Sequence, residues 1–193
     1  MKKSKITIIG LGYTGLPLLI AFYKKKYHIS GFDLDREKVL RLKNGIDDTR
    51  EIANTDLGNL KKIKITSSLS DIKKTDVFVI SVPTPIYKNN APDLRNIILA
   101  SKMVGKFLKK NNIVIYESTV YPGCTEEVCI PILEKISGLK INKEFYCGYS
   151  PERINPGDKT KKIQDVIKIT SGSNKKSAKI IDKLYSSIIK VGT

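Results

Sequence analysis

The sequence predicts a doubly wound α/β fold, with a mostly parallel sheet and helices on both faces. Short β-branched runs alternate with segments of helical apolar spacing, which is typical of parallel strands joined by crossover helices. A glycine-rich turn at residues 10–15 follows the first of these runs directly. The 193 residues, 40% of them hydrophobic, suffice for one domain over residues 1–193 without an internal repeat or linker. Together these features predict a Rossmann-type domain.

The first half of the chain is expected to alternate strands and helices in order. Residues 5–9 form a nearly continuous apolar run, suited to a strand buried on both faces. A helix should follow over 13–25, with Pro17 in or just past its first turn, where a missing N–H costs least. A strand is expected at 28–33 and a helix at 35–43, ended by Gly45 in the C′ position. We expect a loop and a short helix over residues 46–60, a strand over 61–66, and a single helical turn over 70–75.

The second half begins with a strong buried strand at 77–82. Asp93 is expected to cap a helix over 94–108, whose apolar spacing is interrupted only at Ser101. A strand at 113–116 and a helix at 125–136 should follow, with Glu126 and Glu127 near the positive end of that helix. A strand is expected at 144–149, then a Pro/Gly loop to residue 158. The chain should finish with a strand at 166–170, a helix at 175–187 and a strand at 188–191.

The composition favours a cytoplasmic protein. The sequence contains no run of about 18 apolar residues, which a membrane-spanning helix would need. The basic N-terminus is not followed by the apolar core of a signal peptide. Cys124, Cys129 and Cys147 are too few and too scattered for a disulfide framework, so buried thiols are expected. His28 is the only histidine, and no metal site is expected.

The formal net charge of +16 raises the alternative of a nucleic-acid-binding protein. Only five of the 35 basic residues are arginines, the side chain on which specific nucleic-acid surfaces usually depend. The lysines are dispersed through expected helix surfaces and turns. A solvated surface is therefore the favoured interpretation, and no nucleic-acid partner is expected.

The turn at residues 10–15 has the spacing G-x-G-x-x-G between an expected strand and an expected helix. In this pattern Gly10 permits the tight turn, Gly12 lets the backbone approach a pyrophosphate, and Gly15 lets the helix pack closely on the sheet. The phosphates of the ligand then lie at the helix N-terminus, where free N–H groups favour an anion.

Asp33, at the end of the second expected strand, is the residue that indicates which nicotinamide dinucleotide is preferred. A carboxylate in this position binds the ribose hydroxyls and repels a 2′-phosphate, which favours NAD over NADP. Arg36 and Lys38 lie nearby, and either could meet a phosphate, so NADP stays an alternative at this stage.

Two further loops follow expected strands, at the edge where open parallel sheets bind ligands. Residues 82–85 (Val-Pro-Thr-Pro) place Thr84 there, and residues 116–123 place Thr119 there. Prolines commonly follow strands, so each loop alone also fits a purely structural role. Their presence on the same edge favours contact with the nicotinamide half of the cofactor.

With these loops the chain resembles the N-terminal domain of the UDP-glucose/GDP-mannose dehydrogenase family, from Ile6 onward. It is most similar to the branch that oxidises UDP-N-acetylhexosamines, such as UDP-N-acetylglucosamine 6-dehydrogenases of bacterial surface-polysaccharide synthesis. Pro156 distinguishes this branch, since UDP-glucose enzymes usually carry an acidic residue there. The motifs that carry the resemblance are residues 10–17, 31–33, 43–47, 82–85, 116–123 and 149–158.

The resemblance implies oxidation of a sugar C6 alcohol to a carboxylate with two NAD molecules. The first hydride transfer gives an aldehyde, a cysteine forms a thiohemiacetal, the second transfer leaves a thioester, and water releases the acid. Thr119 would help position the reactive water, and Glu152 would act as a general base or water orienter. A salt bridge within its loop, with Arg153, is the alternative for Glu152. The expected cofactor-binding residues are Gly10, Gly12, Tyr13, Thr14, Gly15, Asp33, Lys38, Pro83, Thr84 and Thr119.

Two departures from the family pattern affect these expectations. Residue 14 is usually Val in the family and is Thr here, which is compatible with a backbone contact. The family's nucleophilic Cys, its catalytic Lys and its Asn belong to a second domain, and the three cysteines here do not lie in the nucleophile motif. This chain alone is therefore expected to bind NAD without completing the oxidation.

The resemblance also implies that the longer enzyme is a homodimer, built on a central helix that lies beyond this domain. The domain alone is compatible with a monomer. The non-enzymatic alternative is a stand-alone NAD-binding or regulatory module.

Overall fold

A six-stranded sheet forms the centre of the protein in a computed structural model that describes residues 4–153 and 163–193. Its strand order is β3-β2-β1-β4-β5-β6, and every neighbouring pair is parallel. The chain leaves β1 toward one side of the sheet and β4 toward the other, which makes a topological switch point between them. The strands are β1 (Lys5–Ile9), β2 (His28–Phe32), β3 (Lys64–Thr66), β4 (Val77–Ile80), β5 (Ile113–Tyr116) and β6 (Tyr146–Tyr149).

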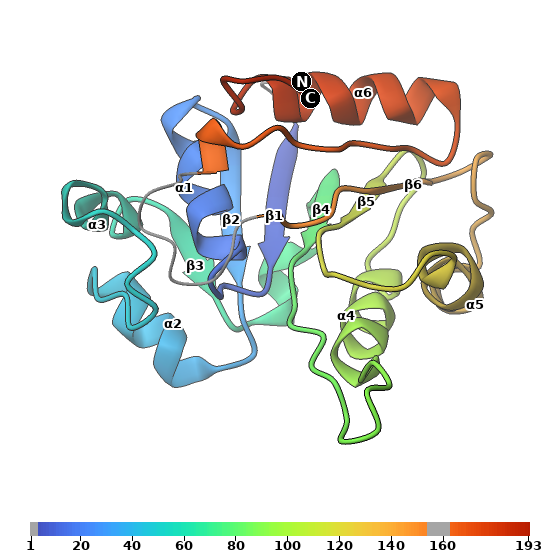
Figure 1. Cartoon of the computed structure of the whole chain (residues 1–193), viewed down its shortest axis with the longest axis horizontal. Coiled ribbons are helices and arrows are strands. Elements are labelled where there is room, and N and C mark those ends of the chain that lie inside the picture. Colours follow the sequence, from blue (N-terminus) through green and yellow to red (C-terminus); the bar gives the residue numbers. More distant parts are fainter. Residues whose placement is uncertain (1–3, 154–162) are drawn as a thin grey trace.

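Helices cover both faces of this sheet, so the predicted fold class is confirmed (Figure 1). Successive strand residues point to opposite faces. Val77 and Val79 of β4 join the core under α1 and α6, while Phe78 and Ile80 join the core under α4 and α5. The helical elements are α1 (Gly15–Lys24), α2 (Arg36–Lys43), α3 (Asn54–Leu60), η1 (Leu69–Ile72), α4 (Arg95–Gly105), η2 (Thr125–Cys129), α5 (Ile130–Ser137), η3 (Ile163–Asp165) and α6 (Lys175–Ser186).

Several local predictions are confirmed with their physical reasons. Gly45 follows α2 with φ +79°, and the amides of Gly45 and Ile46 bond back to the last helical turn, as expected at C′. Ser101 interrupts the apolar face of α4 because its hydroxyl is hydrogen-bonded to the buried hydroxyl of Tyr116, at 2.8 Å. Residues 46–60 form a loop and the short helix α3.

The strand predicted at 166–170 is absent. Its alternation is inverted, because Ile167 and Ile169 are 57% and 52% exposed whereas Lys168 is 2% exposed. The segment continues along the edge of β6 with only two backbone hydrogen bonds, from Ser171 N and Ser173 N to carbonyls of β6. In return a strand amide, Cys147 N, donates to the Ser173 hydroxyl, so a regular ladder does not form.

The predicted strand at 188–191 is also wrong. The amides of Ile188 and Ile189 both donate to the carbonyl of Tyr185, so the chain leaves α6 through a helical turn. Both isoleucines are buried in the core beneath α1 and α6. Their apolar character therefore reflects burial rather than strand pairing.

Three helix starts differ from the prediction in position, helical type or cap residue. The first helix begins at Gly15 rather than residue 13. The helix predicted at 125–136 begins as a π-helical turn, η2, because Pro131 near the start of α5 has no N–H for a regular i→i−4 bond. Leu94, not Asp93, occupies the cap position of α4, although the Asp93 carboxylate accepts the backbone N–H of Arg95.

Polar side chains tie the strands together near their amino ends. The Thr7 hydroxyl bonds to those of Ser30 and Thr75, at 2.9 and 2.6 Å, and the Asn112 amide donates to the carbonyl of Thr75. These three bonds lie in the central and amino-terminal part of the strands, away from the loops that follow them. Buried hydroxyls are satisfied here without any ligand.

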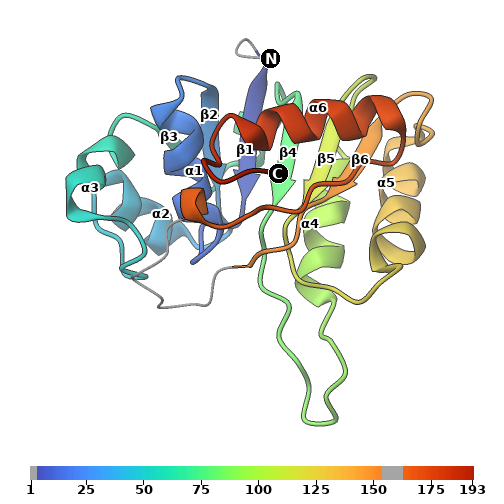
Figure 2. The ribbon, with the colours of Figure 1, turned by 45° about the horizontal axis from the view of Figure 1, so that its top comes forward.

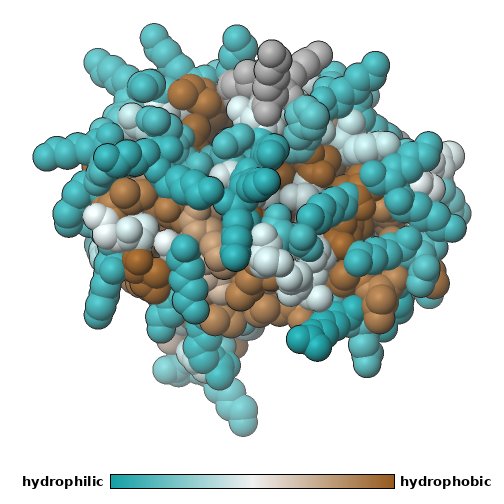
Figure 3. Space-filling view, turned by 180° about the vertical axis from the view of Figure 1, so that it is seen from behind, coloured by the Kyte–Doolittle hydropathy of each residue, from teal (hydrophilic) through white to brown (hydrophobic). Residues whose placement is uncertain are grey.

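The loop after β4 leaves the body of the domain as a hairpin arm over residues 83–92, closed by an antiparallel bridge between Ile86 and Pro92 (Figure 2). On the face seen in Figure 3, hydrophilic side chains project over the whole surface between apolar areas. No helix within the described residues is long and apolar enough to cross a membrane. Residues 154–158 of the last motif, with Pro156, and residues 1–3 lie outside the described residues.

Candidate functional site

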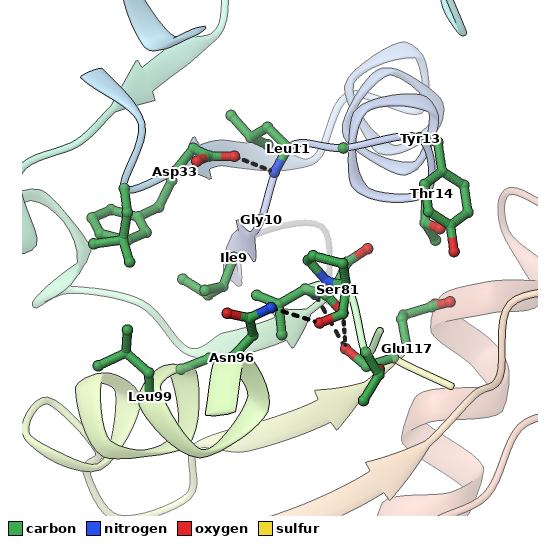
Figure 4. Close-up of a pocket in the computed structure, with 18 of the residues that line it drawn as sticks. Ile9, Gly10, Leu11, Tyr13, Thr14, Asp33, Ser81, Asn96, Leu99 and Glu117 are labelled. Atoms are coloured by element: carbon green, nitrogen blue, oxygen red, sulfur yellow. Dashed lines mark hydrogen bonds between the residues drawn. The ribbon is translucent and has the colours of Figure 1, made fainter. Parts of the chain in front are cut away.

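A cavity of about 340 Å³ opens at the carboxyl ends of the strands, beside the switch point (Figure 4). The turn after β1, the end of β2 and the loops after β4, β5 and β6 all contribute to its lining. It brings together every predicted site residue except Gly15. The predicted residues on its wall are Gly10, Gly12, Tyr13, Thr14, Asp33, Lys38, Pro83, Thr84, Thr119 and Glu152.

The three glycines of the turn differ in the space around them. Gly10 has φ +93°, and a Cβ there would meet the carbonyl oxygen of Ser81 at 2.6 Å. A Cβ on Gly15 would lie 1.9 Å from the carbonyl oxygen of Gly10. A Cβ on Gly12 would meet nothing within 4 Å. Gly12 therefore borders open space, and a ligand can approach the backbone there.

Helix α1 begins immediately beyond this turn. Its hydrogen-bond ladder starts with Leu16 N donating to Gly12 O, at 3.0 Å. The amides before Leu16 belong to the first helical turn, whose N–H groups have no partner within a helix and carry partial positive charge. The lining residues Tyr13 and Thr14 contribute two of these amides. The arrangement suits an anionic group such as a pyrophosphate.

Asp33 is fixed at the other end of the turn. One of its carboxylate oxygens accepts the N–H of Leu11 at 2.9 Å and the Lys38 ammonium at 3.0 Å, and the other accepts the N–H of Asp35 at 3.0 Å. Lys38 therefore neutralises Asp33 and lines the cavity with it. Arg36, the other basic residue considered for a 2′-phosphate, is exposed on α2 and is not among the lining residues.

The loops after β4 and β5 are locked to each other by Ser118. Its hydroxyl accepts the N–H of Val82 at 3.1 Å and donates to the carbonyl of Val82 at 2.7 Å. Asn96 of α4 donates to the carbonyl of Pro83, which fixes the same loop from below. The Thr84 hydroxyl oxygen is buried and has no hydrogen-bond partner within the described residues. A buried polar atom on a cavity wall indicates a contact that a ligand would complete.

Glu152 reaches the cavity from the loop after β6, beside Thr119, which is exposed. The Glu152 carboxylate accepts the backbone N–H of Arg153 at 2.7 Å. The Arg153 guanidinium donates instead to the carbonyl of Ile167, at 3.5 Å.

A buried ionic cluster lies behind the cavity wall and was not predicted. Glu117 lines the cavity but is 1% exposed, and its carboxylate points toward α6 (Figure 4). It accepts the Lys168 ammonium at 2.5 Å and the hydroxyl of Tyr185. Burial raises the pKa of the Glu117 carboxyl above its ordinary value, and the Lys168 ammonium opposes that effect.

Sequence reasoning therefore missed Ser118, Asn96 and the cluster of Glu117, Lys168 and Tyr185. The one available signal was Lys168 itself, a lysine in the middle of a β-branched run. Cys124, Cys129 and Cys147 are all buried and free, as predicted, and none of them lines the cavity. In the part of the chain that the structure describes, no group of three or more His, Cys, Asp or Glu side chains is placed to hold a metal.

Comparison with known proteins places these features in a family. The model of the UDP-glucose/GDP-mannose dehydrogenase family, NAD binding domain, matches residues 4–189. The chain is 49% identical over 193 residues to UDP-N-acetyl-D-glucosamine 6-dehydrogenase of Pseudomonas aeruginosa, and 50% identical over 189 residues to the enzyme of that name from Salmonella typhi. These alignments cover 100% and 98% of the chain but only 46% and 44% of the relatives.

Solved structures agree with the fold. UDP-D-ManNAc dehydrogenase from Pyrococcus horikoshii superimposes with a TM-score of 0.86 at 33% identity, over 97% of the chain and 46% of that protein. NDP-N-acetyl-D-galactosaminuronic acid dehydrogenase from Methanosarcina mazei Go1 superimposes with a TM-score of 0.90 at 29% identity, over 99% and 43%. The chain thus spans a little less than half the length of these four relatives.

Proposed function

Because the chain belongs to the UDP-glucose/GDP-mannose dehydrogenase family, as its NAD binding domain, we propose that it is the cofactor half of a UDP-N-acetylhexosamine 6-dehydrogenase. The reaction would convert the C6 alcohol of the sugar to a carboxylate. Support for this substrate class comes from the names of the relatives at 49% and 50% identity. The relatives' additional length would supply the sugar-binding and covalent parts of the chemistry.

The proposal rests mainly on three features that line one cavity. They are the open space at Gly12, the fixed carboxylate of Asp33, and the buried hydroxyl of Thr84, which has no hydrogen-bond partner within the described residues. They fit the three parts of NAD in order. The pyrophosphate would lie against the amides at the start of α1, the adenosine ribose at Asp33 and Lys38, and the nicotinamide half at the loops of Thr84 and Thr119.

Bound NAD would supply the hydride acceptor, and the chain's own residues would orient the reaction around it. The loops with Pro83, Thr84 and Thr119 form the wall beside the expected nicotinamide position. The Glu152 carboxylate, on the same wall, is suited to accept a proton from the alcohol or from water. Ser118 holds the first two loops at a fixed separation, so Thr84 and Thr119 would meet a ligand without rearranging.

A binding titration tests the cofactor assignment. The 193-residue chain is titrated with NAD and with NADP by calorimetry under identical buffer conditions. We expect NAD to bind more tightly, because Lys38 is already paired with Asp33 and Arg36 lies off the cavity wall. Tighter binding of NADP, or no binding of either nucleotide, would contradict the proposal.

A chimera tests the activity. The alignment with the Pseudomonas aeruginosa relative covers 46% of that protein. The chain is joined to the part of that protein that lies beyond the aligned region. Formation of NADH is then followed with UDP-N-acetylglucosamine, UDP-N-acetylmannosamine or UDP-glucose as the substrate. Turnover of an N-acetylhexosamine substrate is expected. A chimera that binds NAD but oxidises none of these sugars would favour the NAD-binding or regulatory module instead.

A further inference from the structure

The buried cluster of Glu117, Lys168 and Tyr185 lies where the regular sheet ends. The last backbone bonds between β4, β5 and β6 run from Glu117 N to Ile80 O, at 2.8 Å, and from Ser150 N to Tyr116 O, at 2.9 Å. Thr119 and Glu152 each come two residues later, outside the ladder. Something other than the sheet must therefore fix the loops after β5 and β6 relative to each other.

Lys168 makes that connection. Its ammonium donates to the carboxylate of Glu117 at 2.5 Å and to the carbonyl oxygen of Pro151 at 3.0 Å. Glu117 is two residues before Thr119, and Pro151 is directly before Glu152. One side chain from a third segment thus bridges the two loops that carry the predicted catalytic groups.

The cluster is built for fixed geometry. Lys168 and Glu117 are 2% and 1% exposed, and the hydroxyl of Tyr185 holds the second oxygen of the carboxylate. The Lys168 backbone is anchored as well, since its N–H donates to the carbonyl of Gly192. Buried ion pairs seldom add net stability compared with apolar side chains of similar volume, so stability is a weak reason for placing a charge pair here.

We propose that Lys168 is a positioning residue, which sets the separation between the Thr119 loop and the Glu152 loop at the nicotinamide end of the cavity. This inference rests on the proposed function, since it takes the nicotinamide to lie at these loops. Within the described residues, no hydrogen bond or ion pair joins the cluster to the adenosine end, which is formed by the turn after β1 and by Asp33. A change at Lys168 should therefore affect one end of the dinucleotide and spare the other.

The test compares two ligands on the same chain. NADH reports on both ends, and its nicotinamide fluorescence reports on the reactive end; ADP-ribose carries only the adenosine diphosphate part. In Lys168→Met we expect about five- to tenfold weaker binding of NADH, which corresponds to one lost hydrogen bond at the loops, and less enhancement of nicotinamide fluorescence. The affinity for ADP-ribose should stay within about twofold of the unchanged chain.

A second variant distinguishes a loss of positioning from a loss of the fold. Lys168→Met leaves a buried carboxylate without its partner, so the double variant Glu117→Gln/Lys168→Met removes both charges together. It is compared with Glu117→Gln alone, in which Lys168 still reaches Pro151. The double variant should fold and should show the larger loss of NADH affinity and fluorescence. Thr75→Val, which removes a buried hydrogen bond near the amino ends of the strands, is the matched control and should bind both ligands like the unchanged chain.

The outcomes separate the inference from the function beneath it. If the unchanged chain binds NADH but the double variant binds it equally well, Lys168 does not position these loops. If NADH and ADP-ribose weaken together in the double variant, the cluster is structural only. If the unchanged chain binds neither ligand, the proposed function itself fails.

Discussion

Two single-methyl substitutions in the same turn should have opposite effects, and together they test how the chain holds a dinucleotide. Gly12→Ala places a methyl group where no atom lies within 4 Å, so the fold has room for it. Its free energy of unfolding should change by no more than about 1 kcal/mol. Gly15→Ala places the same group 1.9 Å from the carbonyl oxygen of Gly10, which is backbone and cannot move aside freely. It should lower the free energy of unfolding by about 3 kcal/mol.

Binding should follow the reverse order. The open space at Gly12 is where we place the pyrophosphate, so a methyl group there would push the phosphates off the amides of the helix start. Two hydrogen bonds to a charged acceptor are worth about 1.5–3 kcal/mol each, and their loss weakens NAD binding roughly a hundred- to ten-thousandfold. Gly15→Ala should retain much of its affinity for NAD in whatever fraction stays folded.

Urea unfolding measures the first effect and calorimetric titration with NAD the second. Gly58→Ala in α3 is the matched control, because a Cβ there also meets nothing within 4 Å and the residue does not line the cavity. Gly58→Ala should bind NAD normally and be more stable by about 1 kcal/mol, as Ala is favoured over Gly in a helix. A well-folded Gly12→Ala that binds NAD like the unchanged chain would refute the placement of the phosphates.

Three further predictions concern other parts of the structure. Asp33→Asn should weaken NAD binding about tenfold and reduce the preference for NAD over NADP, because it removes the charge that we propose faces the ribose. Parallel titrations measure both effects, with the remote Asp56→Asn as control. All three thiols should resist a thiol reagent near neutral pH and react after unfolding, since they are buried and burial raises the pKa of Cys129 to about 12; rapid labelling of the native chain would contradict this. The Arg95 guanidinium holds the pKa of Asp93 well below its ordinary value of 3.8, so this pair should stabilise the domain above that value and lose its effect as the pH falls below it. Unfolding midpoints of the unchanged chain and Asp93→Asn should therefore differ at neutral pH and converge in acid.

Most of the fold could be predicted because the signals were local. β4 is four consecutive buried residues, and Gly45 and Pro17 mark helix ends and starts by their own backbone limits. The two wrong strands, at 166–170 and 188–191, are apolar runs whose state depends on tertiary contacts. At 167–169 the apolar residues are exposed and the lysine is buried, which no periodicity of a single segment can indicate.

The parts of the site that could be predicted are the glycine turn and the loops that follow strands. The turn at residues 10–15, Asp33 and the two threonine loops each follow a strand, so the rule for parallel sheets places them together. Ser118 and the cluster of Glu117, Lys168 and Tyr185 could not be found in this way. Their partners lie 36 to 68 residues away, and nothing in a local pattern shows which charges will meet.

The hydroxyl and amide bonds of Thr7, Thr75 and Asn112 lie in the central and amino-terminal part of the strands, whereas we propose that the nucleotide binds at their carboxyl ends. Strands β1 and β4 are five and four residues long, so roughly 13–17 Å separates their two ends. Tolerance to change should therefore be unevenly distributed over the molecule. Loop substitutions after the strands should change which dinucleotide is preferred while the melting temperature stays nearly constant, whereas changes among the buried hydroxyls should lower the melting temperature and leave the dinucleotide preference intact. An engineer seeking altered specificity would diversify only one end of this sheet.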